Sequence, residues 1–178
     1  MPLLLTGAPG VGKTTVIRAV AERLGGSRLG GFFTREIRPR GVRKGFELVT
    51  FDGERAVMAH VDRPGPPRVG KYGVDVGVVD TLSRSALAVR PKADVYLVDE
   101  IGKMECLSNE FVERVRTLLE AGSPMVATVG QRGGGFIQAV KRRRDVELWT
   151  LRRDNRDEMP AHVLAWLVGH ARSVTRVR

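Results

Sequence analysis

The hydrophobic and polar positions of the chain follow two periods, one typical of strands and one typical of helices. Residues 3–6 form a short apolar run that ends in a glycine-rich turn, which predicts a buried strand. Beyond residue 13 the apolar residues recur with a helical period until Gly25-Gly26 ends the pattern. The apolar face of this helix carries Val16, Ile17, Val20, Ala21 and Leu24. The chain therefore begins with a strand, a glycine-rich loop and a helix.

Residues 31–60 have the pattern of consecutive strands. The separators are Pro39-Arg40-Gly41 and Asp52-Gly53, and the second is a favourable hairpin turn. The predicted strands cover residues 31–38, 45–51 and 55–60. They predict an antiparallel β-meander inserted after the first strand–helix unit. Residues 62–73 are rich in proline and glycine and predict a loop.

From residue 78 onward, predicted helices and strands alternate. A helix is expected from about Val78 to Val89 with Pro91 marking its end, and Ser108 can cap another that ends near Gly122. Further strands are expected at 95–98, 124–129 and 146–150, a short basic helix after 133–135, and a final helix over 163–171. This alternation indicates a three-layer α/β domain with a mostly parallel sheet, and we expect residues 1–178 to form a single domain.

Composition narrows the class of protein. Hydrophobic residues make up 42% of the 178 positions and charged residues 28%, as in globular proteins. The longest apolar runs have about five residues, far below the roughly 20 needed to span a bilayer, so no membrane segment is expected. The first residues lack the features of a secretory signal. The single cysteine, Cys106, excludes an internal disulfide framework and favours a cytoplasmic location.

The net charge of +10 admits two interpretations. A clustered basic face would indicate nucleic-acid binding, whereas scattered cations merely attract small polyanionic substrates. The basic residues are scattered, apart from Lys141–Arg144 and Arg152-Arg153. Nucleic-acid binding therefore stays open but is not favoured, and we expect a monomer.

A phosphate-binding motif joins the first predicted strand to the first helix. Glycines at these positions let backbone N–H groups converge on phosphates, and the helix offers its positive N-terminal end. Lys13 would reach the β- and γ-phosphates, Thr14 would coordinate Mg²⁺, and Thr15 continues the nucleotide-binding segment. The motif G-x-x-x-x-G-K-[ST] is matched by Gly7, Ala8, Pro9, Gly10, Val11, Gly12, Lys13 and Thr14.

Two adjacent acids, Asp99 and Glu100, follow the apolar strand at 95–98. Their position predicts that they lie at the carboxyl edge of the sheet, beside the phosphate-binding loop of residues 7–14, which we call the P-loop. Asp99 can hold Mg²⁺ through water, and Glu100 can polarise an attacking water. A kinase must exclude water from the γ-phosphate, so a glutamate next to the metal aspartate favours hydrolysis.

The segment Asp99-Glu-Ile-Gly-Lys-Met-Glu105 resembles the signature of the cancer-related (thermophile-type) nucleoside-triphosphatase family. The segments 31–38 and 69–74, and Thr150 with Asn155-Arg156, match that family in the same order. The resemblance thus covers essentially the whole chain. It implies a compact P-loop NTPase domain with an extra catalytic glutamate, and Mg²⁺-dependent hydrolysis of ATP, GTP and other nucleotides to diphosphates.

The resemblance also implies roles for several further residues, each with a structural alternative. Asn155 and Arg156 would lie near the nucleotide base, or Asn155 would stabilise a turn or cap a helix. Lys103 would face the phosphates or solvent, and Glu105 would orient Lys103 or begin a helix. Thr128 would sense the γ-phosphate or, as we favour, be a buried structural residue. Arg132 would contact the transferring phosphoryl group.

The sequence departs from the family pattern at residues 130–135 and at Cys106. Residues 130–135 are unusually rich in glycine, which leaves the role of Arg132 open, and Cys106 replaces an aliphatic residue and is expected to pack as one. The favoured interpretation is an NTP hydrolase with Glu100 as base and Lys13 as phosphate ligand. The alternatives are a phosphotransferase acting on a nucleoside or nucleic-acid end, and a nucleotide-gated nucleic-acid-binding module.

Overall fold

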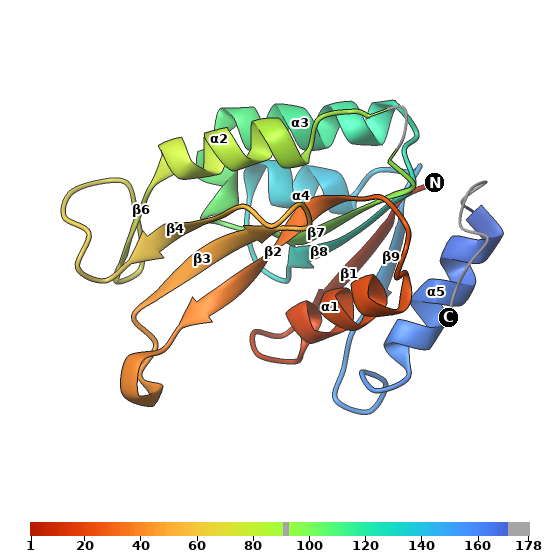
Figure 1. The fold of residues 1–178 in the computed structure, drawn as a ribbon, viewed down its shortest axis with the longest axis horizontal. Coiled ribbons are helices and arrows are strands. Elements are labelled where there is room, and N and C mark those ends of the chain that lie inside the picture. Colours follow the sequence, from red (N-terminus) through yellow and green to blue (C-terminus); the bar gives the residue numbers. More distant parts are fainter. Residues whose placement is uncertain (91–92, 171–178) are drawn as a thin grey trace.

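Nine strands join into one mixed sheet in a computed structural model of the protein, which describes residues 1–90 and 93–170 (Figure 1). The strand order is β5-β6-β4-β3-β2-β7-β8-β1-β9. The strands are β1 (Leu3–Gly7), β2 (Leu29–Ile37), β3 (Gly45–Thr50), β4 (Arg55–His60), β5 (Arg68–Val69), β6 (Tyr72–Val74), β7 (Val95–Ile101), β8 (Met125–Gly130) and β9 (Glu147–Thr150).

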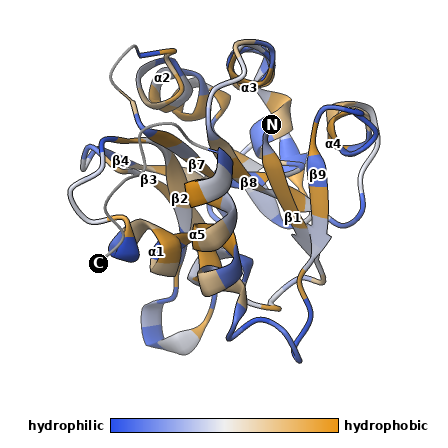
Figure 2. Cartoon of the chain, turned by 90° about the vertical axis from the view of Figure 1, so that its right-hand side faces the viewer, coloured by the Kyte–Doolittle hydropathy of each residue, from blue (hydrophilic) through white to orange (hydrophobic). Residues whose placement is uncertain are grey.

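Helices cover the two faces of this sheet (Figure 1). They are α1 (Lys13–Arg23), α2 (Val76–Ala86), α3 (Asn109–Glu120), α4 (Gly135–Lys141) and α5 (Met159–His170), with 3₁₀ turns η1 (Pro39–Gly41) and η2 (Glu105–Leu107). The helices α2, α3 and α4 pack on one face and α1 and α5 on the other, and each face has its own buried apolar cluster. Figure 2 shows the apolar residues gathered in the strands and along the inner sides of the helices. The expected α/β, three-layer architecture is confirmed.

The sheet changes from parallel to antiparallel at β2. Strands β2, β7, β8, β1 and β9 run parallel to one another, whereas β3 pairs antiparallel with β2 and with β4. The predicted meander is therefore confirmed as β2, β3 and β4, and it extends the main sheet directly. At the carboxyl ends of the parallel strands, the loop after β1 and the ends of β2, β7 and β8 come together.

Two of the predicted element boundaries are wrong. Residues 62–73 were expected to form a loop, but they include β5 and most of β6, which pairs with β4 and buries Tyr72 and Val74. The following helix begins at Val76, two residues early, because Asp75 caps it by accepting a hydrogen bond from Val78 N. Hydrophobic periodicity does not reveal either feature. The β5–β6 hairpin depends on pairing with β4, and the earlier start of α2 depends on the Asp75 cap.

The end of α2 also differs from the prediction, because the helix stops at Ala86 and does not reach Val89. Pro91 and Ala171 lie outside the described residues, so the helix-ending role of Pro91 and the last position of α5 stay predictions. The single domain over residues 1–178 likewise stays a prediction. Among the described residues, no helix combines the length and apolar character needed to cross a membrane.

Candidate active site

The P-loop connects β1 to α1 and leaves the first turn of that helix open. Gly12 occupies the N-cap position with φ 111°, in the left-handed region that glycine favours, and no side chain caps the helix. By contrast, Asp75 caps α2 and Ser108 caps α3 through their side chains. The amide groups at the start of α1 are therefore available to an anion, and the helix dipole favours one there.

Lys13 is buried at the start of α1, with 8% of its surface exposed. Its ammonium donates a hydrogen bond to the carbonyl of Gly7 at 3.2 Å and lies 3.9 Å from Glu100 Oε2. The ammonium thus lies between the phosphate-binding loop and the carboxylate that the sequence assigns as base. A buried cation with carbonyl and carboxylate neighbours is placed to exchange part of that contact for a phosphate oxygen.

The Asp99 carboxylate is 1% exposed and accepts three hydrogen bonds from threonine hydroxyls. Thr14 and Thr34 donate to Oδ2 at 2.5 and 3.2 Å, and Thr128 donates to Oδ1 at 2.6 Å. Thr128 is fully buried, in agreement with the favoured prediction that it is a structural residue. Sequence reasoning missed Thr34, although it lies within the family-like segment 31–38, because its partner is 65 residues away.

The strand that carries these acids is longer than predicted. The sequence indicated that it ends at Val98, but β7 continues to Ile101 and includes both Asp99 and Glu100. The register of pairing with β8 shifts between Val98 and Ile101, so the acids occupy an irregular stretch within the strand. The shorter prediction followed from the end of the apolar run at Val98. The strand continues because three hydroxyl groups donate hydrogen bonds to Asp99, so a charged residue can remain inside the sheet.

Glu100 lies half-buried at the floor of the cleft beside Lys13. Burial raises the pKa of its carboxyl above the ordinary value, the nearby Lys13 ammonium opposes that rise, and Asp99 adds to it. A Cβ atom at Gly130 would lie 3.3 Å from Glu100 Oε1, so the glycine leaves room for this carboxylate. A carboxylate with a raised pKa is a more effective proton acceptor than an ordinary one.

Lys103 and Glu105 occupy different environments. Lys103 is exposed and lines the cleft, in keeping with both of its proposed positions. Glu105 begins η2, is 5% exposed, and has its Oε2 atom 2.7 Å from where a Cβ of Gly102 would lie. Burial, with Glu100 and Asp99 nearby, raises the pKa of Glu105 to about 8, and burial raises the pKa of the Cys106 thiol to about 12. Cys106 packs against the apolar cluster, as expected.

A cleft of about 900 Å³ is lined by Lys13, Thr14, Glu100 and Lys103 together with neighbouring residues. Its lining comes from the P-loop and α1, from β2 and β3, from residues 100–103 and from residues 130–132. The polar and charged groups that line the cleft include Lys13, Thr14, Thr15, Arg18, Thr34, Arg35, Glu36, Arg43, Glu100, Lys103, Gln131 and Arg132. Its volume is within the usual range for sites that hold a ligand of nucleotide size.

Asn155 and Arg156 lie on the loop after β9. The Asn155 side chain accepts a hydrogen bond from Arg152 N at 2.8 Å and donates one to the Thr150 carbonyl at 3.0 Å, so it stabilises its own turn. Arg156 is exposed, and its Cδ atom lies 3.9 Å from where a Cβ of Gly12 would be. The structure thus brings Arg156 beside the P-loop, whereas Asn155 stabilises a turn, the structural role that the sequence left open for it.

The donor atoms near the P-loop suit a hard cation. The Asp99 carboxylate and the Thr14 hydroxyl provide oxygen ligands, which Mg²⁺ prefers, next to the loop that would hold phosphates. In the described ranges 1–90 and 93–170, no group of three His, Cys, Asp or Glu side chains could hold a metal ion. Mg²⁺ is often bound by one or two carboxylates together with substrate phosphates, and the residues present fit that arrangement.

Comparisons with known proteins show the family to which the chain belongs. A family model described as NTPase matches residues 2–164. The nucleoside-triphosphatase THEP1 of Thermotoga sp. (strain RQ2) is 39% identical over 168 residues, covering 94% of this chain and 95% of that protein. The crystal structure of THEP1 from the hyperthermophile Aquifex aeolicus superposes with a TM-score of 0.78 at 33% identity, covering 94% of this chain and 99% of the other.

A second solved structure extends the likeness to animals. The solution structure of a human cancer-related nucleoside triphosphatase matches with a TM-score of 0.79 at 32% identity, covering 98% of both chains. The P-loop NTPase fold expected from the sequence is confirmed by these matches. The chain belongs to the NTPase family, among the THEP1 and cancer-related nucleoside-triphosphatases.

Proposed function

We propose that this protein hydrolyses nucleoside 5′-triphosphates, ATP and GTP among them, to the diphosphate and phosphate in a Mg²⁺-dependent reaction. The observation that carries the proposal is the position of Lys13, between the carbonyl of Gly7 and the carboxylate of Glu100. This contact joins a phosphate-binding loop to a proton acceptor within one cleft. The printed names of the relatives, which are nucleoside-triphosphatases, support the same activity.

The P-loop residues would bind the triphosphate. The open amides at the start of α1 and the Lys13 ammonium stabilise negative charge on the β- and γ-phosphates, and they do so more strongly as charge develops during transfer. The nearby cations Arg132 and Lys103 line the same cleft and raise its attraction for a polyanion. Each of these groups would interact with phosphate and not with a base, so we expect broad nucleotide selectivity.

Asp99 and Thr14 are the residues that would hold Mg²⁺. When bound, the ion would neutralise phosphate charge and align the β- and γ-phosphates. The chain prepares this position by burying the Asp99 carboxylate under three hydroxyl donors, which orient both of its oxygens. Thr34 belongs to this group through its hydrogen bond to Asp99, and it adds a hydroxyl from β2.

Glu100 would act on the attacking water. The water oxygen forms a bond to the γ-phosphorus, the bond to the β–γ bridging oxygen breaks, and the water proton passes to Glu100. The half-buried setting that raises the pKa of Glu100 makes this carboxylate a better acceptor. Gly130 keeps the space beside Glu100 Oε1 free of a side chain.

The substitution Glu100→Gln tests the proposal. It keeps the size of the side chain and removes the proton acceptor, so nucleotide affinity should persist while turnover falls by about 10² to 10⁴. Steady-state phosphate release and equilibrium binding of a non-hydrolysable ATP analogue would measure the two quantities, with Glu113→Gln on the exposed side of α3 as a matched control. Near-normal turnover of the Glu100 variant would refute the assigned role.

Phosphoryl transfer to an acceptor is the second candidate function. One observation favours it, because the lining of the cleft also includes Arg35, Glu36 and Arg43, beyond the groups assigned to phosphate and water. Incubation with ATP labelled at the γ-phosphate and candidate nucleoside or nucleic-acid acceptors distinguishes the two functions. Label recovered as free phosphate supports hydrolysis, and label on the acceptor supports transfer.

A further inference from the structure

A second cavity lies beside the nucleotide cleft, on the α1 face of the sheet. It has a volume of about 630 Å³ and lies between α1, the middle of β2 and the turn that joins β3 to β4. Arg18 lines both this cavity and the nucleotide cleft, so the two spaces share one wall. We call this space the α1–β2 pocket.

The floor of the α1–β2 pocket is apolar and aromatic. Phe33 and Phe51 contribute rings whose centroids are 5.8 Å apart at an interplanar angle of 48°, and Leu29 and Ala21 complete the apolar surface. All four side chains are only partly buried, so they present apolar area to the cavity. Half-exposed aromatic rings of this kind provide stacking surfaces for a planar ligand.

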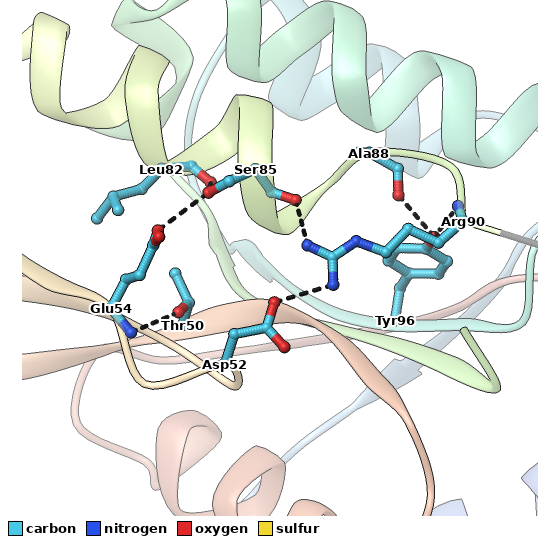
Figure 3. A network of polar contacts seen from close by, with 8 residues as sticks. All are labelled: Thr50, Asp52, Glu54, Leu82, Ser85, Ala88, Arg90 and Tyr96. Atoms are coloured by element: carbon cyan, nitrogen blue, oxygen red, sulfur yellow. Dashed lines mark hydrogen bonds and ion pairs between the residues drawn. The ribbon is translucent and has the colours of Figure 1, made fainter. Parts of the chain in front are cut away.

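One end of the pocket is held by a network of polar contacts (Figure 3). Arg90 donates to Asp52 at 2.9 Å and to the Ser85 carbonyl at 2.8 Å, and its backbone N–H donates to the Tyr96 hydroxyl at 2.8 Å. Arg28 is likewise paired, with Asp94 at 3.1 Å. These arginines are engaged within the protein, so they shape the pocket and leave ligand recognition to other groups.

Arg18 and Glu22 differ from these paired residues. Within the described part of the chain, Arg18 stacks its guanidinium 5.5 Å above the centre of the Phe33 ring and forms no ion pair. Glu22 lines the same pocket one helical turn later and is exposed. A hydrogen-bond donor and an acceptor thus flank an aromatic floor, and the edge of a nucleobase presents both complementary types.

The pocket lies away from the side of the P-loop where Arg156 stands. Arg156 follows β9, at one end of the sheet, whereas Phe33 belongs to β2, with β7, β8 and β1 between them. α1 packs on β7, on β8 and on β2. A base held near Arg156 and a base held on Phe33 would therefore belong to two different molecules.

We propose that the α1–β2 pocket binds the base of a second nucleotide, separate from the triphosphate on the P-loop, by stacking on Phe33 and Phe51 and by hydrogen bonds to Arg18 and Glu22. The inference concerns binding and is independent of whether the P-loop nucleotide is hydrolysed.

The test measures binding to protein whose P-loop is already saturated with Mg²⁺ and a non-hydrolysable ATP analogue. AMP, GMP, CMP and UMP serve as probes in equilibrium dialysis, and ribose 5-phosphate serves as the ligand without a base. We expect one additional equivalent of at least one monophosphate and none of ribose 5-phosphate. Methyl NMR signals of Leu29 and Ala21 should shift on binding, which locates the ligand in the wild-type chain.

Two variants examine the contacts. Phe33→Leu removes the stacking ring and should weaken probe binding about tenfold or more. Arg18→Gln should weaken it as well, whereas Arg23→Gln, an exposed arginine on the same helix outside the pocket, should not. Absence of a second equivalent with all four probes would overturn the proposal. So would a loss of affinity for the ATP analogue itself in Phe33→Leu without a second binding event, because the pocket would then hold the substrate's own base.

Discussion

The Asp99 carboxylate illustrates how far single residues can be interpreted from sequence. Two motifs predict Lys13 with Thr14 and Asp99 with Glu100 as site residues, because each pair has a fixed place in a recognisable segment, and the structure brings the four residues together. Thr34 and Thr128 are not identified in the same way, since their hydroxyls reach Asp99 across 65 and 29 residues. Residues that belong to a short motif can thus be predicted from sequence, whereas the distant hydroxyl groups that hydrogen-bond to them cannot.

Substitution of Thr128 tests how much one of these hydrogen bonds to Asp99 contributes to stability. Replacing it by valine keeps the volume and removes the 2.6 Å hydrogen bond to the buried Asp99 carboxylate. The free energy of unfolding should fall by about 1.5–3 kcal/mol, the range for hydrogen bonds to charged groups. Urea denaturation would measure it, and Thr128→Ser, which keeps the hydroxyl, should lose clearly less. Equal losses in the two variants would contradict a hydrogen-bonding role.

Glu105 gives the stability a pH dependence. Burial raises its pKa from 4.5 to about 8, so the folded chain retains a proton that the unfolded chain releases above about pH 4.5. The contribution is fully present below the unfolded pKa and is lost as pH rises through the folded pKa. The free energy of unfolding should therefore decrease by a few kcal/mol, as an order of magnitude, between about pH 4.5 and about pH 8.

The variant Glu105→Gln isolates this contribution, because the amide has the size of the acid and does not ionise. Urea denaturation at about pH 5, 7 and 9 in the presence of a chelator should show a flatter pH dependence than the wild-type chain. The exposed Glu158→Gln is the matched control and should leave the dependence unchanged. An identical slope for Glu105→Gln and the wild type would exclude Glu105 as its source.

At the scale of elements, the sequence predicts those that carry a strong period or cap. The helix α3 begins where Ser108 was expected to cap it, and β1, β3, β4 and β8 lie close to their predicted ranges. The short hairpin of β5 and β6 was missed, because its pairing depends on β4 and on the burial of Tyr72. The carboxyl end of β7 was missed because charged residues seldom continue a buried strand without partners such as those around Asp99.

The cap of α3 should contribute measurably to stability. The Ser108 hydroxyl oxygen accepts a hydrogen bond from Phe111 N at 2.8 Å, and the hydroxyl donates to Asp80 on α2. Ser108→Ala should cost about 1–2 kcal/mol in thermal or urea unfolding. Ser123→Ala, in the loop after the same helix, should cost much less. A loss below about 0.5 kcal/mol for Ser108→Ala would show that the cap is replaced by other contacts.

At the scale of the whole molecule, ligand binding should stabilise the folded chain. A non-hydrolysable ATP analogue with Mg²⁺ at about 100 times its Kd should raise the free energy of unfolding by about 2.7 kcal/mol, because it binds only the folded state. Thermal denaturation would measure the shift. A chelator should reduce it, and Lys13→Ala should largely abolish it.

The control for this experiment is Arg23→Ala, which removes a cation from the same helix outside both cavities. Its shift should equal that of the wild type. A full shift in Lys13→Ala would contradict the P-loop assignment, and a shift indifferent to chelation would contradict the metal proposal. The net charge of +10 makes all of these affinities sensitive to salt, so ionic strength should be held constant.

The three threonines around Asp99 also bear on how the chain assembles. Thr14 belongs to α1, Thr34 to β2 and Thr128 to β8, and they lie 85, 65 and 29 residues from Asp99. A nascent chain cannot complete this shell until β8, among the last strands to be synthesised, has joined the sheet. Such distant pairings close late in folding. The proposed metal position at Asp99 is therefore complete only in the finished sheet, so recovery of turnover should follow the assembly of β8 during refolding.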